Sequence, residues 1–172
     1  MSWIQTYTGK KFYPLEPHPK DIDIIDIAHA LSLQCRFAGH CTKFYSTAEH
    51  SVHLSRQFED RNIARWALLH DATEAYLVDV PRPIKPLLTN YVEIENRLMD
   101  VIATRFNLPF TMPQCVKDAD ASILHDERMF VMKMTDDQWE SVDQFEPLGV
   151  FIECWSPDKA NLMFLERYIE LL

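Results

Sequence analysis

One stretch, residues 66 to 79, concentrates groups that can bind a metal ion or move protons. Its sequence, W-A-L-L-H-D-A-T-E-A-Y-L-V-D, places His70 beside Asp71, with Glu74 one helical turn later and Asp79 just beyond. The apolar residues between them recur at a helical spacing, which predicts a buried helix. A core helix rarely carries this much ionisable chemistry without a use for it. We therefore interpret this stretch as the centre of an active site.

Helical geometry determines which of these groups share a face. In a helix capped by Asp60 or Asn62, His70 and Glu74 are i, i+4 neighbours, and Asp71 and Glu74 are i, i+3 neighbours. All three side chains then fall within about one third of the helix circumference. We expect this helix to end before the proline-rich segment that follows it.

A second helix is predicted from the sequence S-T-A-E at residues 46 to 49, which forms a capping box. In this motif the Ser46 hydroxyl accepts from the Glu49 amide, and the Glu49 carboxylate bonds back to the first residue. The helix should run to about Phe58 and carries His50 and His53 on nearly the same face. We assign a ligand role to His50, and a supporting or surface role to His53.

A third helix is predicted from Pro113 to about Met134, because Thr111 and Pro113 resemble a helix start. Asp120 lies near the apolar stripe of this helix, whereas Asp118 lies further from it. The residues expected in the core are Val116, Ile123, Leu124, Met129 and Phe130.

Ionisable groups thus occupy inward positions on three helices: His50, then His70 and Asp71, then Asp120. Two imidazoles and two carboxylates suit one first-row divalent metal ion with a coordination position left for water. Such an ion lowers the pKa of bound water and polarises an oxygen of the substrate. Hydrolysis of a phosphoester or phosphoanhydride is the natural use of this chemistry.

Positive side chains gather in two segments of an otherwise acidic chain. The loop C-R-F-A-G-H at residues 35 to 40 offers a guanidinium and a ring, which suit the phosphate and base of a nucleotide. On residue types alone, however, a core position for Phe37 and a helix-capping role for Arg36 are favoured. The rigid segment V-P-R-P-I-K-P holds Arg82 and Lys85, either as a phosphate-facing rim or as a plain connector.

Composition excludes several classes of function. Three glycines are too few for the glycine-rich phosphate loops of nucleotide-binding folds. The net charge of −9 argues against a protein that coats long nucleic acid. Four cysteines form no C-x-x-C pair, and we find no signal peptide and no long apolar span. We expect a cytoplasmic protein with free thiols and no membrane partner.

The whole chain predicts one all-α domain of about six or more helices. Residues 1 to 20, rich in proline and aromatic residues, should form an extended arm over the core, with or without a short hairpin. Residues 135 to 155 form a polar segment with no strong period. The remaining helices are expected at residues 23–34, 90–106 and 156–172.

The ordered residues His50, His70 with Asp71, and Asp120 resemble the H…HD…D pattern of the HD-domain metal-dependent phosphohydrolases. The likeness covers about Asp23 to Phe130 and is closest to bacterial 5′-deoxynucleotidases and to small phage HD hydrolases similar to dATP triphosphohydrolases. The blocks that carry it are C-R-F-A-G-H with F-Y-S-T-A-E-H (35–40 and 44–50), A-E-H-S (48–51), H-D-A-T-E (70–74), D-V-P-R-P-I-K (79–85) and V-K-D-A-D-A (116–121).

This resemblance implies a role for each residue that matches the pattern. His50, His70, Asp71 and Asp120 would hold one divalent ion, namely zinc, cobalt, manganese or magnesium. Glu74 would orient or deprotonate the attacking water, and Asp79 would protonate the leaving sugar oxygen or bind the sugar. The implied substrate contacts are Arg36, Phe37, Lys85, Arg82 and His40. Phe37 departs from the tryptophan of the deoxynucleotidases, so base preference does not transfer.

The resemblance implies an enzyme that releases phosphate, diphosphate or triphosphate from the 5′ position of a deoxynucleotide, and a homo-oligomer. Two alternatives stay open at this point. One is a nucleotide-sensing module of the same fold that binds without turnover. The other is a diiron oxygenase of the same superfamily, for which His53, His29 and His125 are the only obvious additional ligands.

Overall fold

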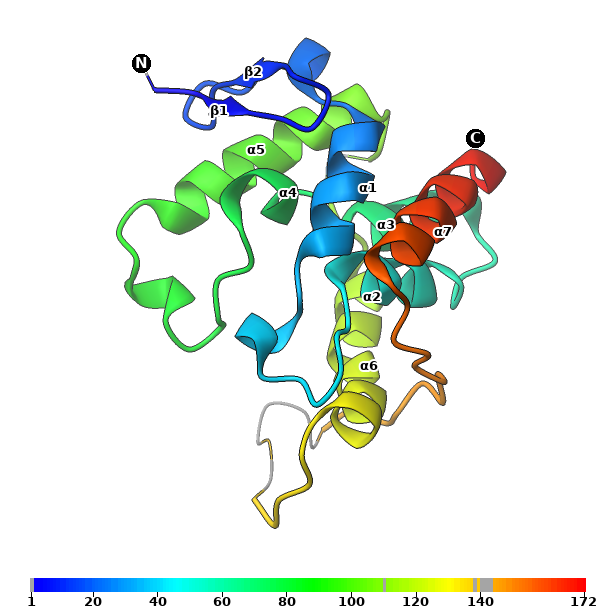
Figure 1. Cartoon of the computed structure of the whole chain (residues 1–172). Helices are drawn as coiled ribbons and strands as arrows, with labels where there is room; N and C mark the ends of the chain where they lie inside the picture. Colours follow the sequence, from blue (N-terminus) through cyan, green and yellow to red (C-terminus); the bar gives the residue numbers. More distant parts are fainter. Residues whose placement is uncertain (1, 110, 138, 140–143) are drawn as a thin grey trace.

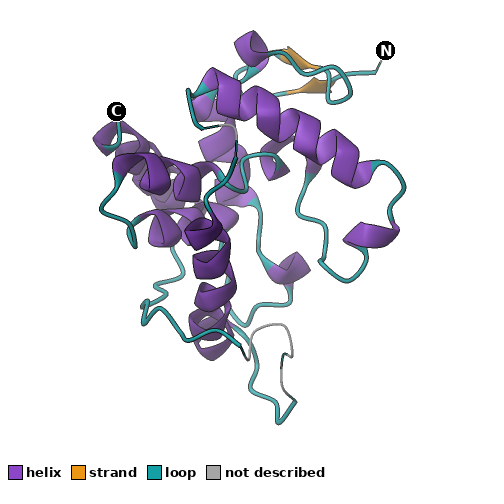
Figure 2. Ribbon diagram, turned by 180° about the vertical axis from the view of Figure 1, so that it is seen from behind, coloured by secondary structure: helices purple, strands orange, loops and turns teal. Residues whose placement is uncertain are grey.

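The computed structural model describes residues 2–109, 111–137, 139 and 144–172 of the 172-residue chain, so part of the polar segment predicted at 135–155 lies outside the described residues. Within the described part the fold is mostly helical, as predicted (Figures 1 and 2). The α-helices of this part are α1 (Ile24–Leu33), α2 (Thr47–Ser55), α3 (Arg61–Leu69), α4 (Glu74–Leu77), α5 (Tyr91–Arg105), α6 (Gln114–Val131) and α7 (Pro157–Glu170). Three short 3-10 turns are η1 (Pro19–Asp21), η2 (Phe37–Gly39) and η3 (Lys85–Leu87).

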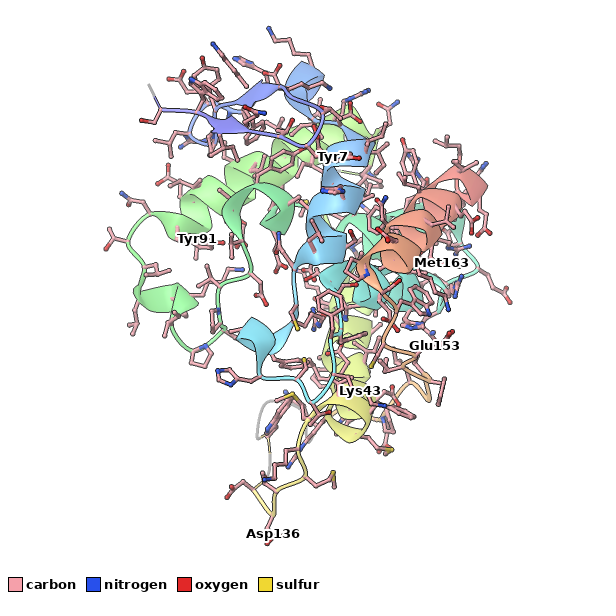
Figure 3. The ribbon with its side chains drawn as sticks, viewed as in Figure 1. Tyr7, Lys43, Tyr91, Asp136, Glu153 and Met163 are labelled. Atoms are coloured by element: carbon pink, nitrogen blue, oxygen red, sulfur yellow. The ribbon has the colours of Figure 1, made fainter. Side chains whose placement is uncertain are left out.

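The amino-terminal arm folds into a hairpin that lies across one end of the helical body (Figure 1). Strands β1 (Ile4–Gln5) and β2 (Lys11–Phe12) pair antiparallel, with Ile4 opposite Phe12. Tyr7, labelled in Figure 3, stacks on His29 of α1 with ring centroids 3.6 Å apart. Phe12 is fully buried and stacks on Tyr76 of α4. The arm is therefore packed against the core rather than loose.

The core forms where α1, α2, α3 and α7 pack together. Helix α1 contacts α7, α2 and α4, and α2 contacts both α3 and α7. Helix α6 runs along this group and touches α2 and α3 (Figure 1). The side-chain oxygens of Ser46 and Asp60 accept from backbone amides in the first turn of α2 and α3, as predicted. Those of Asp23 and Ser156 cap α1 and α7 in the same way.

Two expectations about α6 and α2 are wrong in detail. Met129 is 66% exposed and Phe130 is 36% exposed, because the final turns of α6 bury Asp126 and Glu127 instead. The carboxylate of Glu49 does not return to the start of α2, as a capping box requires. It accepts hydrogen bonds from the amides of residues 153, 154 and 155. Over the described residues, no helix is long and apolar enough to cross a membrane.

Candidate metal centre and its cavity

Three separate segments bring the predicted ligand residues together. Helix α2 supplies His50, the turn after α3 supplies His70 and Asp71, and α6 supplies Asp120. The Nε2 atoms of His50 and His70 lie 3.2 Å apart, and Asp120 Oδ1 lies 3.2 Å from the first and 3.7 Å from the second. Asp71 Oδ2 lies 3.1 Å from His70 Nε2 and 3.7 Å from His50 Nε2. Four side chains thus point at one place.

The helix that was expected to carry His70, Asp71 and Glu74 on one face is broken. Helix α3 ends at Leu69, tight turns follow, and α4 starts at Glu74. The ring of His70 bonds the Ala67 carbonyl at 2.7 Å, and this carbonyl is the acceptor that a continued helix would need. Neighbouring side chains on a helix point about 100° apart. The break allows His70 and Asp71 to present ligand atoms to the same point.

The hydrogen bonds of the two histidines determine which nitrogen is free. Nδ1 of His50 lies 2.6 Å from the Glu127 carboxylate, and Nδ1 of His70 faces the Ala67 carbonyl. Because both partners accept, we assign the proton of each neutral ring to Nδ1. The two Nε2 lone pairs then face each other at 3.2 Å with carboxylate oxygens beside them. This donor set fits a divalent cation, which would satisfy all four groups.

Charge in the cluster favours ionised carboxylates. Burial raises the pKa of Asp71, but His70 and His50 outweigh it and lower the pKa to about 2. Burial raises the pKa of Asp120, but hydrogen bonds from His50 and His70, when these rings are protonated, outweigh burial and hold the pKa well below its usual range. Burial lowers the pKa of His70, yet Asp71 and Asp120 raise it well above its ordinary value. The cluster therefore attracts positive charge, which a proton or a metal ion can supply.

A cavity of about 860 Å³ opens beside this cluster. It has the size of a small-molecule site. Its lining includes nine residues of the predicted site: Arg36, Phe37, His40, Asp71, Glu74, Asp79, Arg82, Lys85 and Asp120. His50 and His70 are buried and are not part of the lining. The two histidines therefore meet the cavity through the carboxylates that surround them.

Two carboxyl groups in the cavity wall have raised pKa values. Burial, followed by the charges of Asp71 and Asp79, raises the pKa of Glu74 to about 9. Burial also raises the pKa of Asp79, and the negative charge of Asp71 adds to this effect. One carboxyl oxygen of Glu74, Oε2, is buried and has no hydrogen-bond partner within the described structure. Glu74 can therefore hold a proton close to the metal centre at neutral pH.

Arg36 does not cap the end of α1, which was the plain alternative for this residue. Its Nη2 lies 3.0 Å from Glu127 Oε2, and its Nη1 lies 3.6 Å from Asp71 Oδ2. The guanidinium also lies over the Phe37 ring, 5.5 Å from the centroid. Phe37 packs partly against the core and lines the cavity at the same time. The pair thus joins the cavity wall to the cluster.

The cations of the proline-rich rim differ in their surroundings. Lys85 Nζ lies 2.7 Å from Glu95 Oε1 of α5, so this cation is already paired. The side chain of Arg82 is 65% exposed and reaches to within 3.8 Å of Asp120 Oδ2. Tyr91, at the start of α5 (Figure 3), supports this rim by donating from its hydroxyl to the Val78 carbonyl. The rim therefore has a fixed base and one exposed cation at the mouth.

The structure adds two residues that the sequence pattern did not predict. Glu127 lies two helical turns after Asp120 on α6 and contacts His50, and this i, i+7 spacing was the available signal. Trp139 lines the cavity, with its ring centroid 5.7 Å from that of Phe37. It falls in the aperiodic segment at 135–155, where periodicity gives no signal.

His53 has a supporting role, as predicted. Its Nε2 lies 3.3 Å from Glu49 Oε1, and its ring packs on Trp155. His53 therefore faces away from the ligand cluster. Within the described ranges, the group of histidine and acidic side chains close enough to hold an ion contains His50, His70 and Asp120.

Comparison with known proteins gives one relative that matches nearly the full chain and another that matches about two thirds of it. No protein-family model matches the sequence. The chain is 40% identical over 172 residues to a protein of Escherichia coli K12 named uncharacterized protein YfdR. The matched region covers 99% of this chain and 96% of that protein. It is also 39% identical over 127 residues to uncharacterized protein RCAP_rcc00048 of Rhodobacter capsulatus, across 69% of this chain and 65% of that protein.

Proposed function

The chain belongs to the same family as YfdR of Escherichia coli, and we propose that it is a metal-dependent phosphohydrolase that releases phosphate groups from the 5′ position of deoxynucleotides. One observation carries the proposal. Two histidine Nε2 atoms, 3.2 Å apart with both Nδ1 atoms engaged elsewhere, meet two ionised carboxylates beside a cavity of nucleotide size. The order of these residues along the chain resembles that of the HD-domain phosphohydrolases.

His50, His70, Asp71 and Asp120 would hold one divalent ion. When bound, such an ion lowers the pKa of a water ligand and polarises a phosphoryl oxygen. The protein keeps both rings in the tautomer that ligation requires, through Glu127 and the Ala67 carbonyl. Ligand orientation is therefore prepared by groups outside the cluster.

Glu74 and Asp79 would manage the protons of the reaction. Glu74 lines the cavity close to Asp71 and would accept a proton from the attacking water. Asp79 would deliver a proton to the sugar oxygen as it leaves phosphorus. A divalent ion held by Asp71 would lower the pKa of Glu74, so that its carboxylate could accept this proton. The raised pKa of Asp79 favours the protonated form that a proton donor needs.

Arg36 and Phe37 would bind opposite ends of the substrate. The guanidinium lies next to the cluster, where a phosphate would also contact the ion. The Phe37 ring faces the cavity beside Trp139, where a base can stack. Arg82 would add charge at the mouth. An anionic phosphate and an aromatic base are the two features that this cavity can recognise.

The test is a substrate panel. The protein is incubated with each deoxynucleoside monophosphate and triphosphate, together with zinc, cobalt, manganese or magnesium, and the phosphate, pyrophosphate and triphosphate products are separated. We expect one nucleotide class to be turned over only in the presence of a divalent ion. If the protein binds a nucleotide tightly but forms no product with any member of the panel, the result would favour a nucleotide sensor over an enzyme. Two irons in each chain would favour an oxygenase instead.

A further inference from the structure

Glu127 connects two parts of the site that are far apart in the sequence. Its side chain is completely buried on α6, and three donors surround it. Nδ1 of His50 lies 2.6 Å from Oε1, the hydroxyl of Tyr45 donates to the same oxygen at 2.9 Å, and Nη2 of Arg36 donates to Oε2 at 3.0 Å. One carboxylate therefore bonds both a predicted metal ligand and the arginine of the cavity wall.

We propose that Glu127 is a positioning residue that couples the binding of the metal ion to the binding of the substrate phosphate. The second half of this inference rests on the proposed function, whereas the first half concerns metal affinity alone. Glu127 does not line the cavity, so it acts through His50 and Arg36 rather than on the substrate.

The contact with His50 explains the first half. A carboxylate that accepts from Nδ1 fixes the ring tautomer and orientation, and it makes Nε2 a stronger electron-pair donor. Loss of such a partner typically weakens metal affinity by about 10 to 100-fold. His50 has no rotational freedom to find another partner, because it is fully buried on α2.

The contact with Arg36 explains the second half. The guanidinium bridges two carboxylates, with Nη2 on Glu127 and Nη1 near Asp71, a predicted metal ligand. Without Glu127 the remaining attraction would draw Arg36 toward Asp71. If Arg36 pairs more closely with Asp71, it weakens the binding of the metal ion by that carboxylate. It also moves away from the position where it would contact the substrate phosphate. The two effects should therefore appear together in one variant.

The decisive variant is E127Q, and a matched control lies beside it. The amide of E127Q keeps one acceptor oxygen but turns an NH₂ group toward donors, because every partner of Glu127 donates. Asp126 is also buried on α6, yet its carboxylate accepts from the amides of residues 148 and 149, away from the cluster. D126N thus removes a buried carboxylate of α6 whose hydrogen bonds lie away from the metal centre, and it serves as a control for the general effect of such a loss.

The affinity for zinc is measured by competition with a chromophoric chelator, and KM and kcat are measured on the nucleotide selected by the panel. We expect E127Q to bind zinc about 10 to 100-fold more weakly and to show a higher KM at saturating metal, while D126N retains both values. Wild-type zinc affinity in folded E127Q would overturn the inference. An unchanged KM in folded E127Q would overturn the coupling to phosphate.

Nitrogen NMR of the wild-type protein loaded with zinc provides a second measurement that does not depend on folding of the variant. We expect a proton on Nδ1 of His50, held in a strong hydrogen bond, and no proton on Nε2. The opposite tautomer would overturn the role of Glu127. If wild-type protein binds zinc but hydrolyses no nucleotide, the proposed function fails, whereas the effect of E127Q on zinc affinity still decides the first half of the inference.

Discussion

The buried polar side chains of α2 and α6 fall into two groups, although members of different groups are neighbours in the sequence. Glu49 precedes His50, and Asp126 precedes Glu127. Glu49 and Asp126, which we call the anchor carboxylates, accept hydrogen bonds from backbone amides of the segment before α7. They connect α2 and α6 to a distant part of the chain, and this gives them a structural role.

Their sequence neighbours His50 and Glu127 contact ionisable groups instead. His50, His70, Asp71 and Asp120, which we call the site cluster, share one small volume. Their carboxylates have few fixed partners and face a cavity. The difference teaches that burial alone does not identify a functional carboxylate. A functional carboxylate is identified by its partners. Backbone amides satisfy the charge of a carboxylate permanently, whereas titratable neighbours leave that charge available to a ligand.

The largest effect should come from the site cluster. H70A or D71A should abolish stoichiometric metal binding and lower nucleotide hydrolysis by roughly three orders of magnitude, since a catalytic ion supplies several kcal/mol. The helical fold should persist, because neither side chain belongs to the apolar core that packs the helices together. Metal analysis, turnover and circular dichroism measure these outcomes. Turnover that survives in a variant free of metal would place the chemistry elsewhere.

A smaller effect is expected at an anchor carboxylate. E49Q should lower the free energy of unfolding by about 3 kcal/mol, because buried amides lose a charged acceptor, while zinc affinity stays at the wild-type value. Urea unfolding measures the first quantity and chelator competition the second. The matched control is E153Q, which removes an exposed carboxylate paired with Lys159 and should change stability little. If E49Q lost zinc affinity but kept its stability, the division between structural anchor carboxylates and a metal-binding site cluster would be wrong.

A third prediction concerns pH and sharpens the account of Glu74. Folding raises the pKa of this carboxyl group from 4.5 to about 9, so the folded protein keeps a proton that the unfolded chain has released. In chelator-treated protein, the free energy of unfolding should therefore fall as pH rises from about 5 to about 9, by at most ~1.4 kcal/mol per pH unit.

The control for this pH effect is E74Q, which mimics the protonated form and should flatten the curve. Urea unfolding across the pH range gives both slopes. An equal slope in E74Q and the wild-type protein would mean that another group carries the effect. A slope of opposite sign would mean that Glu74 is ionised in the folded state.

The sequence was most informative where local rules apply. Apolar periodicity predicted the helices, and the oxygens of Ser46 and Asp60 cap α2 and α3 as expected. The pattern of His50, His70, Asp71 and Asp120 also predicted which residues meet in space, because each lies at an inward position of its segment.

The sequence was least informative where a side chain depends on a distant partner. The carboxylate of Glu49 could complete a local capping box, but it bonds amides more than one hundred residues later. The sequence of α6 does not distinguish Glu127 from the other polar residues of this helix. Its role becomes evident only from its hydrogen bonds with Arg36 and Tyr45. The break after Leu69 depends on a bond from a ring to a carbonyl, which no helix propensity describes.

The amino-terminal hairpin has a consequence for the order of folding. Its strands pair through contacts close in sequence, so the hairpin can form early during synthesis. Its docking contacts need later parts of the chain, since Thr8 donates to Asp26 of α1 and Phe12 stacks on Tyr76 of α4. Helix α4 also begins with Glu74. The hairpin can therefore form locally but reaches its final place only after α1 and α4 are present, and its docking supports the helix that carries Glu74.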